Sequence, residues 1–134
     1  MQGNNNREEL MRYRLNSAKE RLSAAKILYA AGEYKDAISR SYYAMFTAVR
    51  GLLAMDAVDF SKHAGVISYF QKEYIKSERL DRKYSKYLTT AFQIRNNADY
   101  ADFYIVSKND VEEQIQHASE LLAAITDYIK ENLE

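Results

Sequence analysis

The sequence predicts an all-α fold: an antiparallel up-and-down four-helix bundle with one extra short helix between the second and third long helices. Two observations on composition favour helices. The chain of 134 residues contains no proline and only four glycines, and these residue types interrupt helices. The third observation is the spacing of the apolar residues, which recur at alternating steps of three and four and so form one stripe along a helix.

The first two long helices are expected over residues 7–31 and 34–55, after a flexible polar tail at residues 1–6. Gly32 lies between them and suits a helix C-cap. In the first helix the apolar stripe consists of Met11, Leu15, Ala18, Leu22, Ala25 and Tyr29. In the second helix it consists of Ile38, Tyr42, Met45, Val49 and Leu52. Each stripe is suited to burial against a nearly antiparallel neighbour.

The short extra helix is expected over residues 61–75, the third long helix over residues 81–96 and the last from about residue 109 onward. Ser107, with Asp110 three residues later, resembles a capping arrangement that begins the last helix. The inward residues of the short helix are Val66, Phe70 and Tyr74. Those of the third long helix are Tyr84, Leu88, Ala91 and Phe92. Those of the last helix are Val111, Ile115, Ala118, Leu122, Ile125 and Ile129.

Length and composition restrict the class of protein. Residues 7–134 are expected to form a single domain, because a chain of this length supports one hydrophobic core. A composition that is 47% apolar, with charges of both signs, is typical of a globular protein. The absence of cysteine excludes disulfides, a thiol nucleophile and a cysteine zinc site. No apolar run approaches the length of a membrane span, so we expect a soluble, cytoplasmic protein with no membrane partner.

Charge is distributed unevenly along a chain whose net charge is zero. Residues 1–95 contain 17 basic and 10 acidic side chains, whereas residues 96–134 contain 2 and 9. One interpretation is that an acidic last helix packs beside basic helices in the bundle. The other is a basic groove that binds phosphate. The neutral total argues against strong non-specific binding of nucleic acid, which depends on many phosphate contacts.

Common catalytic and cofactor motifs are absent from the sequence. The four glycines are isolated, so there is no glycine-rich phosphate loop. His63 and His117 are the only histidines and belong to different expected helices, which excludes a histidine metal cluster. Asp99 and Asp102 follow a helix and are more typical of solvated turns or caps than of a cation site. We therefore expect neither a metal nor a cofactor.

Arg95 is the charged residue that most needs an explanation. It comes seven residues after Leu88 and three after Phe92, so in a helix it projects from the apolar face, where a charge needs a partner. Three roles are open. In the first, Arg95 is a structural anchor paired with Asp99, with Asp36 or with tyrosine hydroxyls. In the second it is a phosphate or nucleotide ligand, and in the third it is part of an active site.

Three blocks of the chain resemble the HEPN domain family (higher eukaryotes and prokaryotes nucleotide-binding), in particular its small stand-alone prokaryotic branch, the UPF0332-type proteins. The blocks are AISRSYYAMFTAVRGLLA at residues 37–54, KHAGVISYFQKEYI at 62–75 and RNNADYADF at 95–103. The resemblance covers roughly residues 15–122 and implies a helical bundle that often forms homodimers. It also implies a partner, a minimal nucleotidyltransferase, often in a toxin–antitoxin module.

The resemblance also implies roles for the residues around Arg95. Many HEPN proteins are metal-independent ribonucleases with an arginine, a polar residue beside it and a histidine a few positions later. Arg95 and Asn96 match the first two, but Tyr100 occupies the histidine position. Histidine, with a pKa of about 6.5, suits proton transfer in RNA cleavage, whereas tyrosine, at about 10, is rarely ionised at neutral pH. The departure therefore favours binding without ordinary catalysis.

Arg40 and Tyr43 lie three residues apart in the first block and are expected on the same side of their helix. In one interpretation they only pack against the Arg95 segment. In the other they belong to a nucleotide- or RNA-binding set that consists of Arg95, Asn96, Tyr100, Arg40 and Tyr43.

Three functions from different classes remain open. The first is a non-catalytic HEPN subunit that binds nucleotide or RNA, or serves as the partner of a nucleotidyltransferase. The second is a metal-independent endoribonuclease toxin in which Arg95 acts with Tyr100 or His63. The third is a purely structural helical interaction protein, in which removing Arg95 costs stability alone. We also expect a homodimer, from the resemblance and from the twelve tyrosines and four methionines that suit an interface.

Overall fold

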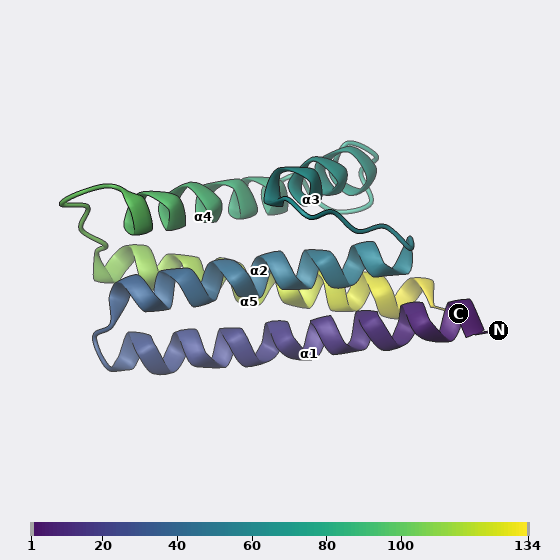
Figure 1. Cartoon of the computed structure of the whole chain (residues 1–134), viewed down its shortest axis with the longest axis horizontal. Helices are drawn as coiled ribbons and strands as arrows, with labels where there is room; N and C mark the ends of the chain where they lie inside the picture. The colour runs from purple at the N-terminus through teal and green to yellow at the C-terminus, as the bar shows by residue number, and fades with distance from the viewer. Residues whose placement is uncertain (1, 134) are drawn as a thin grey trace.

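The computed structural model describes the chain from residue 2 to residue 133, with side chains from residue 6 onward. The helices of this range are α1 (Gln2–Ala30), α2 (Tyr34–Met55), α3 (His63–Phe70), η1 (Gln71–Ile75), α4 (Lys83–Tyr100) and α5 (Lys108–Asn132). The predicted all-α fold is confirmed. Four long helices run up and down beside one another, and α3 with η1, which follow α2 in the chain, lie in the same layer as α4 (Figure 1).

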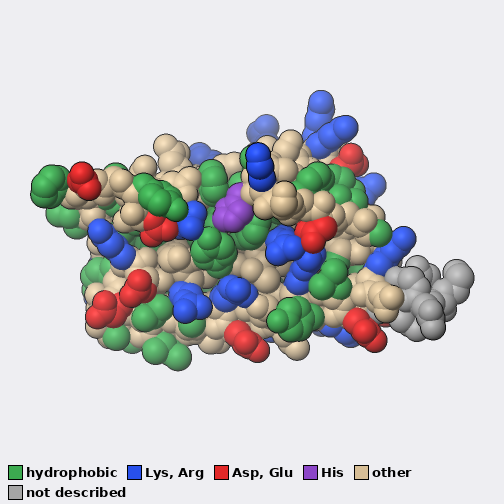
Figure 2. Space-filling model, in the orientation of Figure 1, with side chains coloured by type: hydrophobic (Ala, Val, Ile, Leu, Met, Phe, Trp, Pro, Cys, Tyr) green, Lys and Arg blue, Asp and Glu red, His purple; other side chains and the backbone are tan. Residues whose placement is uncertain are grey.

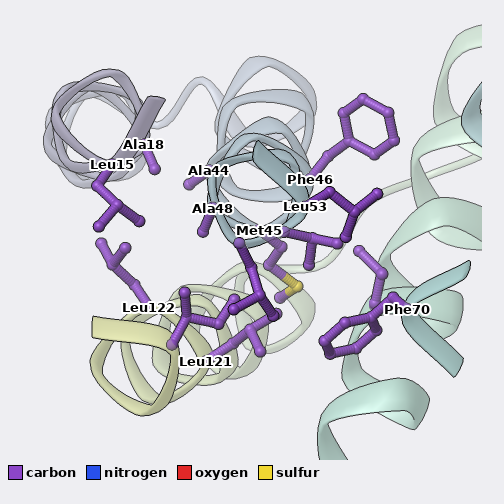
Figure 3. Close-up of a cluster of buried hydrophobic side chains, with 14 of the residues drawn as sticks. Leu15, Ala18, Ala44, Met45, Phe46, Ala48, Leu53, Phe70, Leu121 and Leu122 are labelled. Carbon is purple, nitrogen blue, oxygen red and sulfur yellow. The ribbon is translucent and has the colours of Figure 1, made fainter. Parts of the chain in front are cut away.

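The main core lies between α1, α2 and α5, and the α3 side of the molecule closes it. Leu15 and Ala18 of α1 face Leu122 of α5, while Phe70 of α3 approaches Met45 and the rest of the α2 stripe (Figure 3). Small residues of α2 alternate with large ones, which lets neighbouring helices approach closely. Because α2 also contacts α4, it is the central helix and presents one side to the α3–α4 layer.

A second, smaller core cluster lies where α4 ends and α5 begins; it consists of Ala37, Ile38, Ala98, Val106 and Val111. Beside it, Nε2 of the buried Gln114 donates hydrogen bonds to the carbonyl oxygen of Ile38 at 2.9 Å and to Oγ of Ser41 at 2.7 Å. These bonds fix α5 against α2, and the burial of Ala98 fixes the last turns of α4 in the same place.

Both predicted caps are confirmed. Gly32 adopts φ of 80°, and the amide of Glu33 donates to the Leu28 carbonyl at 2.9 Å, as in a glycine-terminated helix end. Ser107 and Asp110 form a reciprocal capping box at the start of α5. Turn and cap chemistry therefore sets the ends of α1 and the beginning of α5.

Three boundaries differ from the prediction. Helix α1 begins at Gln2, so residues 2–6, where we expected a flexible tail, are helical. The short helix begins at His63 rather than at residue 61, and its second part, Gln71–Ile75, is a π-helical turn. Helix α4 continues to Tyr100 instead of ending at residue 96.

The longer α4 decides the geometry of the candidate site. Asparagine and aspartate, which recur after Arg95, have modest helix propensity, and this made the end at residue 96 plausible. Burial of Ala98 in the smaller core cluster stabilises the additional turn. Arg95, Asp99 and Tyr100 therefore lie on one continuous helix. Over the residues that the structure describes, none of the helices combines the length and the apolar character needed to cross a membrane.

Candidate functional site

Arg95 lies near the end of α4 and is oriented by neighbours on its own helix. Its Nε is 3.0 Å from Oδ2 of Asp99, one turn later. Its Nη1 donates a hydrogen bond of 3.1 Å to Oδ1 of Asn96. The Arg95 side chain is 17% exposed and that of Asp99 is 37% exposed. The guanidinium is thus held in one orientation while part of it still reaches solvent.

Two tyrosine rings flank this guanidinium. Cζ of Arg95 is 5.3 Å from the ring centre of Tyr43 and 6.0 Å from that of Tyr100, within the range of a cation–π contact. Tyr43 is half-buried on α2, whereas Tyr100 is 77% exposed. Tertiary packing therefore brings Tyr43 to Arg95 from a different helix, and leaves most of the Tyr100 ring in solvent.

His63, the first residue of α3, lies in the same group of aromatic rings. Its ring centre is 4.3 Å from that of Phe46 and 5.9 Å from those of Tyr43 and Phe92. Burial lowers the pKa of His63, and the positive charge of Arg95 lowers it further. Tyr43 thus lies close to both His63 and Arg95.

Tyr42 forms a hydrogen bond with the ring of His63. The Tyr42 hydroxyl is buried and lies 3.0 Å from Nδ1 of His63. Burial raises the pKa of Tyr42, so the hydroxyl keeps its proton. It can therefore donate a hydrogen bond to Nδ1. A neutral His63 ring then carries its own proton on Nε2 and presents a hydrogen-bond donor to a ligand.

Two surface hollows border this group, one lined in part by Tyr43 and the other in part by His63; Arg95 lines neither. We call the first the Arg40 hollow; it has a volume of about 490 Å³ and is lined by Arg21, Leu28, Asp36, Ser39, Arg40 and Tyr43. We call the second the Phe60 hollow; it has a volume of about 380 Å³ and is lined by Phe46, Arg50, Asp59, Phe60, Ser61 and His63. On the face shown in Figure 2, a histidine lies with lysine or arginine side chains on both sides of it.

The sequence-predicted residues occupy distinct places in this arrangement. Arg95, Asn96 and Tyr43 are brought together, with His63 next to Tyr43. Arg40 is exposed and borders the Arg40 hollow beside Tyr43. Asp36, which we considered as a partner for Arg95, is in the first turn of α2 and lines the same hollow.

An ion cluster that sequence reasoning missed supports the far rim of the Phe60 hollow. Asp59 accepts hydrogen bonds from Nη2 of Arg14 at 3.1 Å, from Nη2 of Arg50 at 3.0 Å and from the amide of Phe60 at 3.0 Å. Burial raises the pKa of Asp59, but these donors outweigh burial and hold it below its ordinary value. Arg14 also donates to the Arg50 carbonyl at 2.9 Å. No periodicity in the sequence could have revealed this cluster, because its members are far apart in the chain.

The described residues contain no group of three histidine, aspartate or glutamate side chains that is arranged to hold a metal ion. The site therefore consists of an oriented arginine, a histidine and several aromatic rings between two open hollows. Such a set of donors and ring faces can bind a phosphate group together with a planar base.

Comparison with known families identifies this class of protein. The model of the HEPN domain matches residues 11–129, which is most of the chain. The protein therefore belongs to the HEPN domain family, and the predicted resemblance is confirmed.

Several relatives agree with this assignment. A UPF0332 protein of Thermotoga maritima is 31% identical over 95% of this chain and 96% of its own length. A protein of Methanocaldococcus jannaschii named as a candidate toxin is 36% identical over 73% of this chain and 67% of its own. A UPF0332 protein of Pyrococcus horikoshii is 44% identical over 52% of this chain and 49% of its own. The chain is thus similar to UPF0332-type proteins over nearly its full length.

Proposed function

We propose that this protein is the nucleotide- or RNA-binding subunit of a HEPN module of the toxin–antitoxin type, and that it binds a phosphate group between Arg95, Tyr43 and His63. The observation that carries the proposal is the convergence of these side chains from α4, α2 and α3, with one hollow beside Tyr43 and another beside His63. The relatives named as candidate toxins support the type of module.

Arg95 is suited to be the principal phosphate ligand. The ion pair with Asp99 and the hydrogen bond from Nη1 to Asn96 orient its guanidinium, so little side-chain entropy is lost when its other N–H groups bind an anion. Arginine also binds phosphate through two parallel hydrogen bonds. Asn96, Arg40 and the exposed Tyr100 complete the proposed binding set at the edges of the site.

His63 completes the site as a hydrogen-bond donor. With Tyr42 donating to Nδ1, the Nε2–H group of a neutral His63 is available to a phosphate oxygen. In this tautomer Nε2 carries a proton and is not a general base, whereas the opposite tautomer, with Nδ1–H donating to Tyr42, would leave Nε2 free. Together with the replacement of the motif histidine by Tyr100, the first tautomer favours binding over ordinary catalysis.

A metal-independent endoribonuclease is the second candidate function, and the position of His63 beside the Arg95 cluster favours it. In that mechanism Nδ1–H of His63 donates to the Tyr42 oxygen, and Nε2 takes the proton of the ribose 2′-hydroxyl. The 2′-oxygen then bonds to phosphorus, the bond from phosphorus to the 5′-oxygen breaks, and the leaving oxygen takes a proton from Tyr100 or water. Arg95 stabilises the charge that builds on the phosphate oxygens.

Partners of two kinds follow from the proposal. A homodimer is expected, so light scattering at micromolar concentration should report a mass of about twice 15.6 kDa. A minimal nucleotidyltransferase encoded beside the gene is expected to form a complex with this chain when the two are co-expressed. A monomer, or two chains that elute separately, would remove the corresponding partner from the proposal.

Binding and cleavage are tested in one experiment. A fluorescently labelled single-stranded RNA is titrated with wild-type protein and with Arg95→Ala, and the RNA is then examined for cleavage on a gel. We expect binding by the wild type, weaker binding by the variant and intact RNA in both. Cleavage by the wild type alone establishes the ribonuclease. Equal affinities of the two proteins would remove Arg95 from the binding site. No binding of RNA, mononucleotide or a nucleotidyltransferase would leave only the structural interaction protein.

A further inference from the structure

His63, which belongs to the proposed phosphate site, also lines the Phe60 hollow. The other residues of this hollow have no role in the phosphate site. Phe60 comes from the connection between α2 and α3 and is 37% exposed. Its ring centre is 5.7 Å from that of Tyr69, at an angle of 47°. One part of the ring is therefore supported by the protein and another part faces the hollow.

Gly65 determines where the Phe60 ring lies. A Cβ atom added at Gly65 would lie 2.9 Å from Cδ1 of Phe60 and 3.0 Å from its Cβ and Cγ, closer than carbon atoms approach without a shift. The ring consequently packs directly on the backbone of the first turn of α3, and any larger residue at position 65 would displace it. The backbone of Phe60 is also fixed, because its amide donates a hydrogen bond to Oδ1 of Asp59.

The charged groups of the hollow have separate tasks. Each carboxylate oxygen of Asp59 accepts two hydrogen bonds, from Arg50 and the Phe60 amide at Oδ1 and from Arg50 and Arg14 at Oδ2. Asp59 is thus saturated and orients its neighbours rather than a ligand. Arg50 donates to Asp59 through Nη2, and its side chain, which lines the hollow, is 34% exposed. The groups left for a ligand are hydrogen-bond donors, with the hydroxyl of Ser61.

We propose that the Phe60 hollow is a second nucleotide subsite. A nucleobase stacks on Phe60, and its carbonyl or ring-nitrogen acceptors face Arg50 and Ser61. The phosphodiester that joins this nucleotide to its neighbour lies at Arg95, on the other side of His63. This inference rests on the proposed function and refines it, because a ligand that fills both places carries a base next to its phosphate, as a single-stranded oligonucleotide does, whereas inorganic phosphate fills the phosphate site alone. Stacking on an aromatic ring beside a basic group is how single strands are commonly bound.

The test compares one ligand that spans both places with one that fills the phosphate site alone. The probes are hexa-adenylate with 2′-O-methyl groups, which cannot be cleaved through the 2′-oxygen, and inorganic phosphate, which has no base to stack. Affinities are measured by calorimetry for wild-type protein, Phe60→Ala, Phe60→Trp, Gly65→Ala and Arg95→Ala. Tyr13→Ala is the matched control, because Tyr13 is a 71% exposed aromatic residue on α1. Circular dichroism verifies that each variant is folded.

If one stacked base is lost, Phe60→Ala and Gly65→Ala should bind the hexanucleotide roughly tenfold more weakly and bind inorganic phosphate as the wild type does. Phe60→Trp should retain hexanucleotide binding, and Tyr13→Ala should change neither affinity. Suppose that Phe60→Ala binds the hexanucleotide as tightly as the wild type does and that Arg95→Ala does not. That result would refute the subsite and leave the phosphate site intact. Wild-type affinity of Arg95→Ala for both probes would refute the phosphate site, and the subsite with it.

Discussion

The substitution Arg95→Ala should separate binding from folding, because the contacts that it removes are few and its charge partner Asp99 is partly exposed. An ion pair of spacing i, i+4 on a helix contributes about 0.3–0.5 kcal/mol, and the pair with Asp99 has this spacing. The cation–π contact with Tyr43 contributes about 0.5–1 kcal/mol at a partly exposed position. The free energy of unfolding should therefore fall by about 1 kcal/mol, a small part of the roughly 5–15 kcal/mol of an ordinary domain.

The effect on binding should be larger than the effect on stability. A hydrogen bond to a charged group contributes about 1.5–3 kcal/mol. Losing one such bond to phosphate corresponds to a loss of affinity of roughly 10- to 150-fold. The variant should thus remain folded and yet fail to bind RNA at concentrations that saturate the wild type.

Urea unfolding followed by circular dichroism measures the first quantity, and fluorescence anisotropy with labelled RNA measures the second. Arg12→Ala is a matched control, since Arg12 also pairs with an acid four residues away, Glu8, at 3.8 Å on an exposed face of α1. It should change neither quantity appreciably. A loss of more than about 3 kcal/mol in Arg95→Ala, the size typical of breaking a buried ion pair, with unchanged RNA affinity, would refute the reasoning and make Arg95 a structural anchor.

Three further predictions concern the residues that shape the site. Folding lowers the pKa of His63 below 6.5, so the unfolded chain binds this proton first, and stability should decline as pH falls through 6.5 toward the lower folded value. Urea titrations over this range should show a smaller decline for His63→Gln, and an identical pH profile would contradict the assignment. Gln114→Ala should lower the free energy of unfolding by about 2 kcal/mol, because it removes two buried hydrogen bonds between α5 and α2; a change below the error of the urea titration would argue against this role. Ser107→Ala should cost about 1 kcal/mol through loss of the cap of α5, seen as a lower thermal midpoint that Ser107→Asp restores.

Much of the fold could be predicted because helices are encoded locally. The three- and four-residue spacing of apolar side chains places them on one face of a helix whatever surrounds it, which is why the core stripes of α1, α2 and α5 agree with the structure. Capping is equally local, as the agreement at Gly32 and Ser107 shows. The pairing of Arg95 with Asp99 is also a matter of one helical turn, once the segment is helical.

Features that join distant parts of the chain could not be predicted in this way. Whether α4 ends at residue 96 or at Tyr100 depends on the burial of Ala98 against α2 and α5. The packing of α1, α2 and α3 places His63 beside Tyr43. It also brings Arg14 to Asp59, 45 residues away in the chain. The close contact of Gly65 with Phe60 likewise has no counterpart in the spacing of residues.

The sequence by itself therefore determined the helices, their caps, the family and the residues worth asking about. The tertiary structure alone decided which of those residues share a site and which hollows lie beside it. The physical reason is that helix geometry relates residues three or four positions apart. Contacts between helices depend on the joint packing of side chains from every segment, which no single stretch of sequence specifies.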